Sequence, residues 1–543
     1  MLNIYKNFCK EEYEGDKLVS FAPMYGEYFN FAYDVVDEIA SREPNKRALF
    51  WCNDKGEEKV FTFGDMSRYS NITANMLLDK GIKYGDRVLV ILKRSYKFWF
   101  VLLALHKIGA IAVPATSMLK ERDILYRCNL AEINAIICTT DGDVIEKVEN
   151  VIQDCSTVRT KISVNEKRDG WIDFDGELKN YSNQIDRIYT TINTPMLIYF
   201  TSGTTGLPKM VCHDYTYAIS HIFTAKHWQN VKPGGLHLTI SDTGWMKSMW
   251  GKMYGQWFME TGIFVYDFDE FVPSDILGLF RKYQITTFCA PPTMYRFFIK
   301  ENLEDYDLSS LEYATVAGEA LNPEVYNKFY DATGIKIMEG FGQSETTLVM
   351  YNPIASAPRL GSMGIPSPLY SVDLVDENDN FVSNGSVGEI VIKTDKQRPC
   401  GMFCGYYKSY EQTKAVWHGG LYHTGDTAWR DEDGYYWYVG RTDDIIKSSG
   451  YRIGPFEIES VLMEHPAVLE CAITGAPDPV RGQVVKATIV LAKGYVGSDE
   501  LKKQIQNYVK GQTAPYKYPR VIEFTDSLPK TISGKIKREE LKI

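Results

Sequence analysis

The sequence predicts an α/β protein built around more than one hydrophobic core. Strand-like and helix-like segments alternate, beginning with a strand at 87–93, a helix at 95–108 and a strand at 110–115. Strands separated by helices are typical of parallel α/β layers. The chain of 543 residues also exceeds the ~250–300 residues at which a single core stops growing.

The rest of the chain extends this pattern and then changes it. Further apolar strands are expected at 133–140, 195–203, 285–292 and 313–321. After about Gly361, short strands alternate with turns rich in Gly and Asp, which predicts an antiparallel, barrel-like section. From Ile445 we expect a compact α/β unit in the order helix, strand, strand, helix, strand, at 456–464, 469–474, 484–492, 499–509 and 521–525. The boundary between the two parts is expected at 440–444, where a strand ends in a charged turn.

Charge and cysteine content narrow the class of protein. The net charge of -10 and the pI of about 5.5 argue against a nucleic-acid partner. The ten cysteines are sparse, and the pair Cys400 and Cys404 has neither a second pair nor a histidine at metal spacing. That pair is a weak zinc signal, so the cysteines predict reduced thiols in a cytoplasmic protein.

No segment has the pattern of a targeting peptide or a membrane helix. The first sixteen residues are acidic and lack an apolar run, so we expect neither a secretory signal nor a transit peptide. The most apolar stretch, 98–115, is interrupted by His106 and Lys107 and punctuated by Gly109 and Pro114. It predicts a buried helix and a buried strand rather than a span of ~20 residues.

The strongest local signal is a run of hydroxyl and glycine residues that ends in a lysine. The run follows a predicted strand and reads Tyr199, Phe200, Thr201, Ser202, Gly203, Thr204, Thr205, Gly206, Leu207, Pro208, Lys209. Small residues let backbone N–H groups approach phosphate oxygens, hydroxyls add donors, and lysine adds a point charge. The run contains neither a Walker A motif nor a G-x-S-x-G nucleophile elbow. A flexible turn is the alternative, but the length and order of the run favour a phosphate-binding loop.

Five further motifs follow in order along the chain. They are Val316-Ala317-Gly318-Glu319, Glu339-Gly340-Phe341-Gly342-Gln343-Ser344-Glu345, Tyr422-His423-Thr424-Gly425-Asp426, Gly440-Arg441-Thr442-Asp443-Asp444-Ile445-Ile446-Lys447 and Leu528-Pro529-Lys530-Thr531-Ile532-Ser533-Gly534-Lys535. Together with the glycine-rich run they resemble the adenylate-forming superfamily of acyl-CoA synthetases, luciferases and peptide-synthetase adenylation domains. Within it, the match is greatest to medium-chain acyl-CoA synthetases, which the segments 29–35, 241–245 and 514–520 resemble.

The resemblance covers nearly the whole chain and implies a fold. It implies an N-terminal domain at 1–442, made of two doubly wound α/β sheets and a distorted β-barrel. A small, mobile α+β C-terminal domain is expected at 443–543, with its hinge at Asp443. The C-terminal domain of such enzymes turns about the hinge to exchange two active sites.

The resemblance also implies a reaction. A short-, branched- or medium-chain fatty acid, ATP and coenzyme A are expected to give acyl-CoA, AMP and pyrophosphate through an acyl-adenylate. An aryl- or other carboxylic-acid ligase that loads coenzyme A or a carrier protein is the first alternative. A nucleotide sensor without activity is the second, disfavoured because Lys535 and Glu345 are both present. The chain ends eight residues after Lys535, so we expect no carrier domain to follow. The oligomeric state is left open, a homodimer included.

The chemistry gives the proposed ATP site a physical reason. A carboxylate that attacks the α-phosphorus brings two anions together, so the site must supply cations. The resemblance makes Lys535 the transfer centre, Lys209 a phosphate ligand and Glu345 the ligand of Mg²⁺. Asp426 is expected to bind the ribose hydroxyls, and Arg441 and Arg452 nucleotide oxygens. The other expected ATP contacts are Thr201, Ser202, Gly203, Thr204, Thr205, Gly206, Leu207, Pro208, Gly318, Glu319, Glu339, Gly340, Phe341, Gly342, Gln343 and Ser344.

Coenzyme A and the acyl chain are assigned to two further groups of residues. The resemblance implies coenzyme A contacts at Ser449, Gly450, Tyr451, Arg481, Lys510, Tyr518, Pro519 and Arg520. The acyl pocket is expected at Trp245, Trp250, Tyr254, Cys289 and Gly340. Trp250, Tyr254 and Trp257 would share one face of a helix, so a core stripe is the alternative. Lys252 lies within that stripe, where a stem reaching to solvent is the default interpretation.

Overall fold

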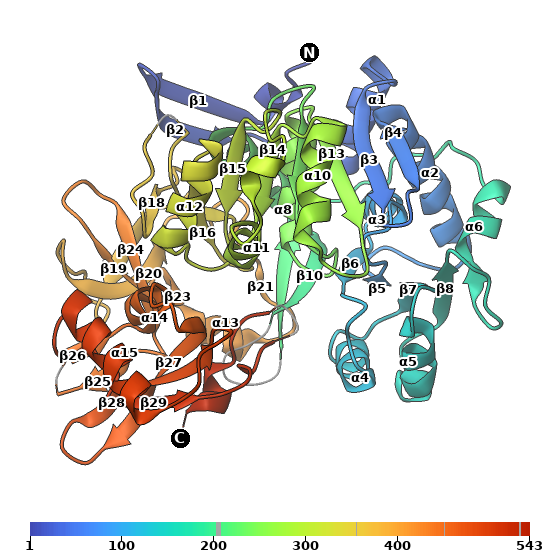
Figure 1. The fold of residues 1–543 in the computed structure, drawn as a ribbon. Helices are drawn as coiled ribbons and strands as arrows, with labels where there is room; N and C mark the ends of the chain where they lie inside the picture. Colours follow the sequence, from blue (N-terminus) through green and yellow to red (C-terminus); the bar gives the residue numbers. More distant parts are fainter. Residues whose placement is uncertain (202–207, 355, 450, 532–533, 543) are drawn as a thin grey trace.

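The computed structural model describes residues 1–201, 208–354, 356–449, 451–531 and 534–542. Its first large sheet has eight strands in the order β21-β11-β10-β6-β5-β7-β8-β9 (Figure 1). The pairs from β10 to β9 are parallel, whereas β11 and β21 are antiparallel. The strands are β5 (Arg87–Ile91), β6 (Ile111–Pro114), β7 (Ala135–Thr139), β8 (Thr160–Val164), β9 (Ile172–Asp173), β10 (Pro195–Thr201), β11 (Lys209–Asp214) and β21 (Gly405–Tyr406).

Helices separate the parallel strands of this sheet, as the sequence predicts. The predicted helix at 95–108 is α3 (Lys97–Ile108), and every residue of α3 is buried. This burial explains its continuous apolar sequence, and α2 (Phe63–Asp79) packs against it. The other helices of this part are α1 (Glu38–Arg42), α4 (Glu121–Leu130), α5 (Val144–Val151) and α6 (Phe174–Glu177).

The second large sheet has fourteen strands and changes character along its width. Its parallel part is formed by β3 (Arg47–Asn53), β12 (Leu236–Thr239), β13 (Gly262–Asp267), β14 (Thr287–Ala290), β15 (Tyr313–Val316) and β16 (Ile337–Gly342), with β4 (Glu58–Thr62) antiparallel at the edge. The helices α7 (Thr216–Phe223), α8 (Lys247–Gly251), α9 (Tyr254–Phe258), α10 (Pro273–Tyr283), α11 (Pro292–Phe298) and α12 (Pro323–Thr333) accompany it.

The antiparallel section differs from the expected barrel. After β16 the same sheet continues through β17 (Leu348–Tyr351), β18 (Ser362–Pro366), β24 (Tyr436–Arg441), β23 (Leu421–Arg430), β20 (Val387–Lys393) and β19 (Val372–Val375), with β22 (Trp417–His418) beside β23. We call this part the antiparallel wing. No strand pair within the described ranges closes it into a barrel, because β16 pairs directly with β17 and keeps the wing hydrogen-bonded to the parallel part.

One apolar core joins the two large sheets. It contains Val88 of β5, Leu197 of β10 and Met338 of β16, all fully buried. The two sheets are therefore held as one body by side chains far apart in sequence. A separate hairpin of β1 (Cys9–Glu14) and β2 (Lys17–Pro23) adds Phe21 to this core.

The C-terminal segment forms its own sheet and its own core. Five strands follow the order β26-β25-β28-β27, with β29 beside β28: β25 (Ile446–Ser448), β26 (Tyr451–Ile453), β27 (Val468–Asp478), β28 (Gly482–Leu491) and β29 (Val521–Phe524). The helices α14 (Pro455–Met463) and α15 (Asp499–Gln512) cover a core that includes Ile458, Ile473 and Ile505. The predicted order helix, strand, strand, helix, strand is confirmed over this range.

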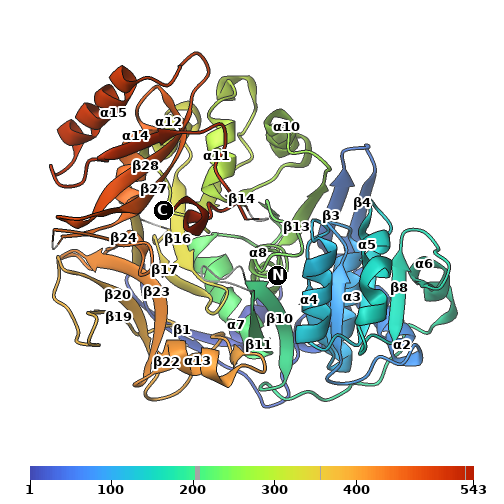
Figure 2. The same cartoon turned by 90° about the horizontal axis from the view of Figure 1, so that it is seen from below.

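The C-terminal unit lies against the antiparallel wing (Figure 2). The rings of Phe456 on α14 and Tyr438 on β24 are 5.9 Å apart. The amide of Asn322 donates to the carbonyl oxygen of Ser460 at 3.3 Å. No helix in the described part of the chain is long and apolar enough to cross a membrane.

Candidate active site

The predicted phosphate loop connects two neighbouring strands of the first sheet. Thr201 at the end of β10 lies opposite Lys209 at the start of β11. Six of the predicted ATP contacts lie outside the described residues: Ser202, Gly203, Thr204, Thr205, Gly206 and Leu207. The ammonium group of Lys209 lies 4.9 Å from the ring centre of Tyr406, so this end of β11 lies against β21.

Glu345 lies close to Lys209 and Tyr406. Its Oε1 accepts a hydrogen bond of 2.8 Å from the hydroxyl of Tyr406. Burial raises the pKa of Glu345, while Tyr406 and the positive charges of Arg441 and Lys209 oppose this shift. An enclosed carboxylate with few hydrogen-bond donors suits a hard cation that binds oxygen ligands. Glu345 therefore fits the role of a Mg²⁺ ligand.

Asp426 on β23 is the second enclosed carboxylate of the site and is 5% exposed. It accepts hydrogen bonds from Gln343 Nε2, from the Tyr438 hydroxyl at 3.2 Å and from Arg441 Nη1 at 3.4 Å. Burial raises the pKa of Asp426, and Arg441 is the largest opposing influence. The structure thus brings Asp426, Gln343 and Arg441 together from three different motifs.

The segments expected beside adenine lie at the carboxyl ends of β15 and β16. Gly318 has a φ of +111°, a conformation that favours glycine, and Glu319 lies 3.8 Å from Arg296. Glu339 is 6% exposed, and burial raises its pKa to about 8. A β-carbon on Gly342 would meet the Thr347 carbonyl oxygen at 2.3 Å, so this position requires glycine.

Phe341 and Ser344 belong to the same segment. Phe341 is partly buried against the main core. The backbone oxygen of Ser344 contacts His213 Nε2 at 2.7 Å, and burial lowers the pKa of His213 to about 4. A neutral His213 on β11 thus ties the segment that carries Glu345 to the first sheet. Pro208 also contributes its carbonyl oxygen, which accepts from the Tyr126 hydroxyl at 3.2 Å.

The charge of Lys535, from the C-terminal unit, acts on groups of this site. The positive charge of Lys535 lowers the pKa of Asp426, although by less than Arg441, Gln343 and Tyr438 do. Burial lowers the pKa of Lys247, and Lys535 also acts on that group. Lys535 is exposed, and its backbone N–H donates to the Thr531 hydroxyl at 3.1 Å. The C-terminal lysine therefore lies within electrostatic reach of both side chains.

Two functional candidates were missed by sequence reasoning. Lys247 on α8 is partly buried next to Gly318, and its ammonium group donates to the Ala317 carbonyl oxygen at 2.6 Å. The sequence marked Lys247 only by its position, two residues after the segment 241–245 that resembles medium-chain acyl-CoA synthetases. Tyr406 belongs to a strand of two residues, and no sequence pattern marks it.

Arg452 takes a different partner in this structure. Its Nη1 is 2.7 Å from the carboxylate of Glu377 on the wing, and Lys447 is 3.0 Å from the same carboxylate. Arg452 therefore does not join the group around Asp426 in this arrangement, and its contact with nucleotide stays a prediction.

The expected hinge is bound by charged side chains of the C-terminal tail. The ammonium group of Lys542 donates to the Asp443 carbonyl oxygen at 3.1 Å. Arg538 lies 3.7 Å from Asp444 and 2.8 Å from Glu459. These contacts connect the last turn of the chain to the segment between β24 and β25.

The expected coenzyme A residues form two small groups on the C-terminal unit. Lys510 and Arg520 both lie over the ring of Tyr518, at 4.1 and 4.9 Å from its centre. Tyr451 stacks on Tyr516 with ring centres 4.0 Å apart.

The neighbours of these two groups make backbone contacts within the same unit. The backbone N–H of Ser449 donates to the Arg481 carbonyl oxygen at 3.0 Å, and the Pro519 carbonyl accepts from Gln506. Gly450 lies outside the described residues. A contact of any of these groups with coenzyme A stays a prediction.

The expected acyl-pocket residues separate into two sets. Trp250 lies 5.9 Å from Trp228, and a β-carbon on Gly340 would meet Trp228 at 2.6 Å. Cys289 is buried in the neighbourhood of Lys247. These residues form one wall, whereas Tyr254 is fully buried and pairs with His106 at 2.8 Å.

The predicted single helix carrying the aromatic stripe is wrong. The chain forms two short helices, α8 and α9, with Lys252 between them. Trp257 donates to the Ala48 carbonyl oxygen and belongs to the core, as the alternative interpretation expects. Trp245 is partly buried at the start of α8.

The interpretation of Lys252 as a stem reaching to solvent is also wrong. The side chain is 1% exposed and its ammonium group donates to the Ser241 carbonyl oxygen at 2.6 Å. Burial lowers the pKa of Lys252 to about 7, with Arg94 acting in the same direction. Lys252 therefore holds the start of the segment 241–245 in place.

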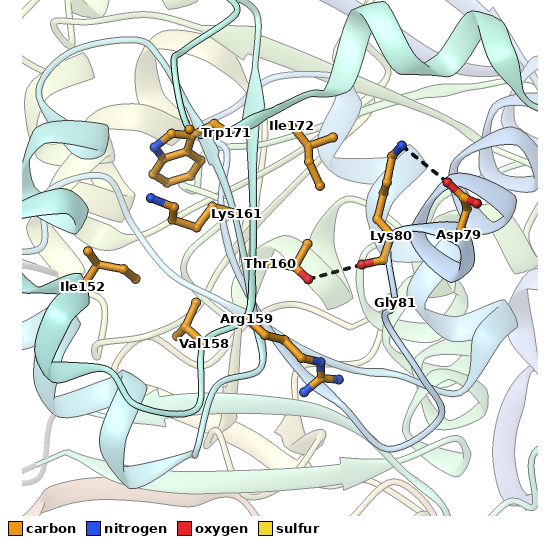
Figure 3. A pocket seen from close by; sticks show the side chains of 11 residues that line it. Asp79, Lys80, Gly81, Ile152, Val158, Arg159, Thr160, Lys161, Trp171 and Ile172 are labelled. Carbon is orange, nitrogen blue, oxygen red and sulfur yellow. Dashed lines mark hydrogen bonds and ion pairs between the residues drawn. The ribbon is translucent and has the colours of Figure 1, made fainter.

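A cavity of about 620 Å³ lies on the first sheet, away from these groups (Figure 3). It is lined by Lys80, Arg159 and Lys161 together with Trp171 and Ile172. Each of the three cations is already paired with a carboxylate, of Glu177, Asp86 and Glu149 in turn. The cations that line the cavity are therefore neutralised before any phosphate could bind there.

Two enclosed carboxylates, Glu345 and Asp426, lie with Lys209 and Arg441 between the two α/β sheets' motif segments, and the charge of Lys535 acts on Asp426; this set of groups is typical of an adenylate-forming ligase. The chain belongs to the AMP-binding enzyme family: the model "AMP-binding enzyme" matches residues 36–407, and "AMP-binding enzyme C-terminal domain" matches 457–535.

Curated relatives and solved structures agree with this class. Acyl-coenzyme A synthetase ACSM3 of Homo sapiens is 40% identical over 95% of this chain and 89% of its own, and ACSM4 of Mus musculus is 40% identical over 95% and 90%. The crystal structure of the anthranilate CoA ligase AuaEII with anthranoyl-AMP has a TM-score of 0.87 at 27% identity, over 95% of this chain and 97% of that one. The predicted AMP-forming carboxylic acid–CoA ligase, with ATP and coenzyme A as substrates, is confirmed.

The expected cytoplasmic location is contradicted by these relatives. ACSM3 and ACSM4 are both named as mitochondrial proteins. Cysteines without disulfide partners do not distinguish the cytoplasm from the mitochondrion.

Proposed function

We propose that this ligase activates short-, branched- or medium-chain fatty acids and passes the acyl group to coenzyme A. The single observation that carries the proposal is that the positive charge of Lys535 acts on both Asp426 and Lys247. This influence relates a cation of the C-terminal unit to the side chains around the expected nucleotide site. The 40% identity to acyl-coenzyme A synthetases over 95% of the chain supports the acid class.

In the first half-reaction the acid carboxylate attacks the α-phosphorus of ATP and displaces pyrophosphate. Lys535 and Lys209 supply positive charge where two anions meet, which is the main requirement of phosphoryl-type transfer. Asp426 accepts from the ribose hydroxyls, and Arg441 holds Asp426 in position at 3.4 Å. Mg²⁺ held by Glu345 would neutralise phosphate charge.

In the second half-reaction the thiol of coenzyme A attacks the acyl-adenylate and releases AMP. Lys535 is not needed for this step, so the C-terminal domain, 443–543, turns about Asp443 and presents Ser449 and Tyr451 instead. Lys510, Arg520 and Arg481 would hold coenzyme A phosphates. The pairing of Arg452 and Lys447 with Glu377 is a contact that such a rotation would have to break.

The acyl wall supports the preference for shorter chains. Trp228 is almost fully buried and anchored by a hydrogen bond of 3.1 Å to the Met338 carbonyl oxygen. Its ring lies against Gly340 and Trp250, so an anchored ring stands beside the residues expected to bind the acyl chain. An aromatic acid is the second candidate, supported by the likeness to the anthranilate ligase.

An acid panel tests the proposal. The full-length protein is assayed for AMP release with butyrate, 2-methylbutyrate, octanoate, benzoate and an amino-acid mixture, each with and without coenzyme A. We expect coenzyme A-dependent AMP release with the fatty acids. Release with benzoate alone would establish the aromatic candidate, and release with amino acids alone would refute both.

A further inference from the structure

Two histidines and an aspartate meet on the surface of the antiparallel wing. His418 ends β22, His423 lies on β23, and Asp379 belongs to the turn that follows β19. His423 Nε2 is 3.9 Å from Asp379 Oδ1, and His418 Nδ1 is 4.0 Å from Asp379 Oδ2. All three potential ligand atoms lie within 4.8 Å of one another.

His423 is the fixed member of this group. Its side chain is 10% exposed, and its Nδ1 is 3.2 Å from Glu389 Oε2. The other oxygen of Glu389 accepts from the Gly425 backbone N–H at 2.8 Å, so the carboxylate cannot turn away. The imidazole is thereby oriented with Nδ1 as donor, which leaves a lone pair on Nε2.

Within the described part of the chain, His423 Nε2 is buried and has no hydrogen-bond partner. A buried nitrogen without a partner is uncommon and requires an explanation. A metal ion would provide one, because a ligating histidine usually donates its second nitrogen to a carboxylate. His423 and Glu389 already have this arrangement, and Nε2 faces Asp379.

We propose that Asp379, His418 and His423 bind a divalent transition-metal ion of the zinc class, with Glu389 orienting His423. Two imidazoles and one carboxylate favour Zn²⁺ or Co²⁺ over Mg²⁺, which prefers oxygen ligands alone. Three protein ligands leave a fourth position for water. His423 lies three residues before Asp426 on β23, so the metal site adjoins the expected ribose contact, and the proposal does not depend on the proposed acid.

Only a small movement would complete the coordination. Metal–ligand distances of about 2.0–2.2 Å place neighbouring atoms of a tetrahedron roughly 3.3 Å apart, somewhat closer than the 3.9 and 4.0 Å observed. His418 is 44% exposed and Asp379 is 49% exposed, so both can turn toward His423. The two imidazole rings are stacked with centres 4.3 Å apart, which protonation of both rings would oppose.

Metal titration of the full-length protein without nucleotide tests the site. Zn²⁺ binding is followed by calorimetry, and Co²⁺ binding by its visible absorption. We expect one tightly bound ion per chain, a rise in Tm and a tetrahedral Co²⁺ spectrum. His418→Ala and Asp379→Asn should each weaken binding at least about tenfold, and Glu389→Gln by about 10–100-fold.

Matched variants keep the result interpretable. His465→Ala removes a histidine outside the group, and Cys404→Ser removes an exposed thiol; both should bind like wild type. His418 and Asp379 are exposed, so their variants should fold and retain activity with ATP. Equal Zn²⁺ affinity in wild type, His418→Ala and Asp379→Asn overturns the proposal, as does loss of binding in Cys404→Ser alone.

Discussion

Gly340→Ala tests whether the Trp228 wall limits the acyl pocket. A β-carbon at Gly340 would meet Trp228 Cε2 at 2.6 Å, Trp228 Cζ2 at 2.7 Å and Leu348 Cδ1 at 2.8 Å. Real β-carbons do not approach other atoms this closely, so the indole has to move. Trp228 is almost fully buried and bonded to the Met338 carbonyl oxygen, and displacing it endangers that bond.

The cost follows from this geometry. Inserting a methyl group into a packed core costs roughly 1–3 kcal/mol, and loss of the indole hydrogen bond adds about 0.5–1.5 kcal/mol. We expect the displaced ring to move toward Trp250, whose ring centre lies 5.9 Å from its own, because Gly340 would carry the added methyl group. The pocket should therefore shorten, and each methylene that no longer fits costs about 1–3 kcal/mol of transition-state binding.

We expect a lower Tm and a selective loss of activity on longer acids. The kcat/KM for octanoate should fall at least about tenfold relative to butyrate, since about 1.4 kcal/mol corresponds to a factor of ten. Gly278→Ala is the matched control. Gly278 lies in α10, and a β-carbon added there would have no other atom within 4 Å, so this change should stabilise the helix by about 0.4–1 kcal/mol.

Two outcomes would refute this reasoning. An unchanged Tm in Gly340→Ala would mean that Trp228 is not packed against Gly340 as the structure places it. An equal loss of kcat/KM for butyrate and octanoate would mean that the ring does not bound the acyl chain. Thermal unfolding and initial-rate measurements on the same preparations distinguish the two.

Three further predictions concern the lysine, a buried acid and the hinge. Lys535→Ala should lower acid-dependent pyrophosphate release by at least about 10²–10³-fold but leave thioester formation from supplied acyl-AMP largely intact. Lys537→Ala is the control. An equal loss in both half-reactions would disprove the division into two active sites. Burial raises the pKa of Glu339 from 4.5 to about 8. Between those pH values the folded chain keeps a proton on Glu339 that the unfolded chain releases. The free energy of unfolding should therefore decline as pH rises from about 5 to about 8. The Tm of Glu339→Gln should accordingly fall less steeply over that interval, and parallel curves would argue against a protonated Glu339. Asp443→Pro should stiffen the hinge and retain pyrophosphate release while acyl-CoA formation drops; undiminished overall turnover would count against rotation at this residue.

The sequence predicted the class of fold because periodicity is a local property. The strand at 87–93, the buried helix at 95–108 and the strand at 110–115 became β5, α3 and β6. The same holds for the C-terminal order of helices and strands. The expected barrel did not follow, because whether antiparallel strands close or extend a sheet depends on which edge pairs with which.

Residues from different motifs meet in the structure. Asp426, Gln343 and Arg441 come from three motifs, and the structure joins them by hydrogen bonds. The aromatic stripe was less informative: the interruption at Lys252 separates α8 from α9, so Trp250 and Tyr254 face different surroundings. Helical spacing is meaningful only if one helix continues through it.

The sequence by itself determined the alternation of strands and helices, the order of the motifs and the kinds of side chain that adenylation chemistry needs. Only the tertiary structure decided that Tyr406 contacts Glu345, that Lys247 lies beside Gly318, and that His418, His423 and Asp379 meet on the wing. Propensity and spacing act over a few residues, whereas these contacts depend on strand pairing between segments far apart in the chain.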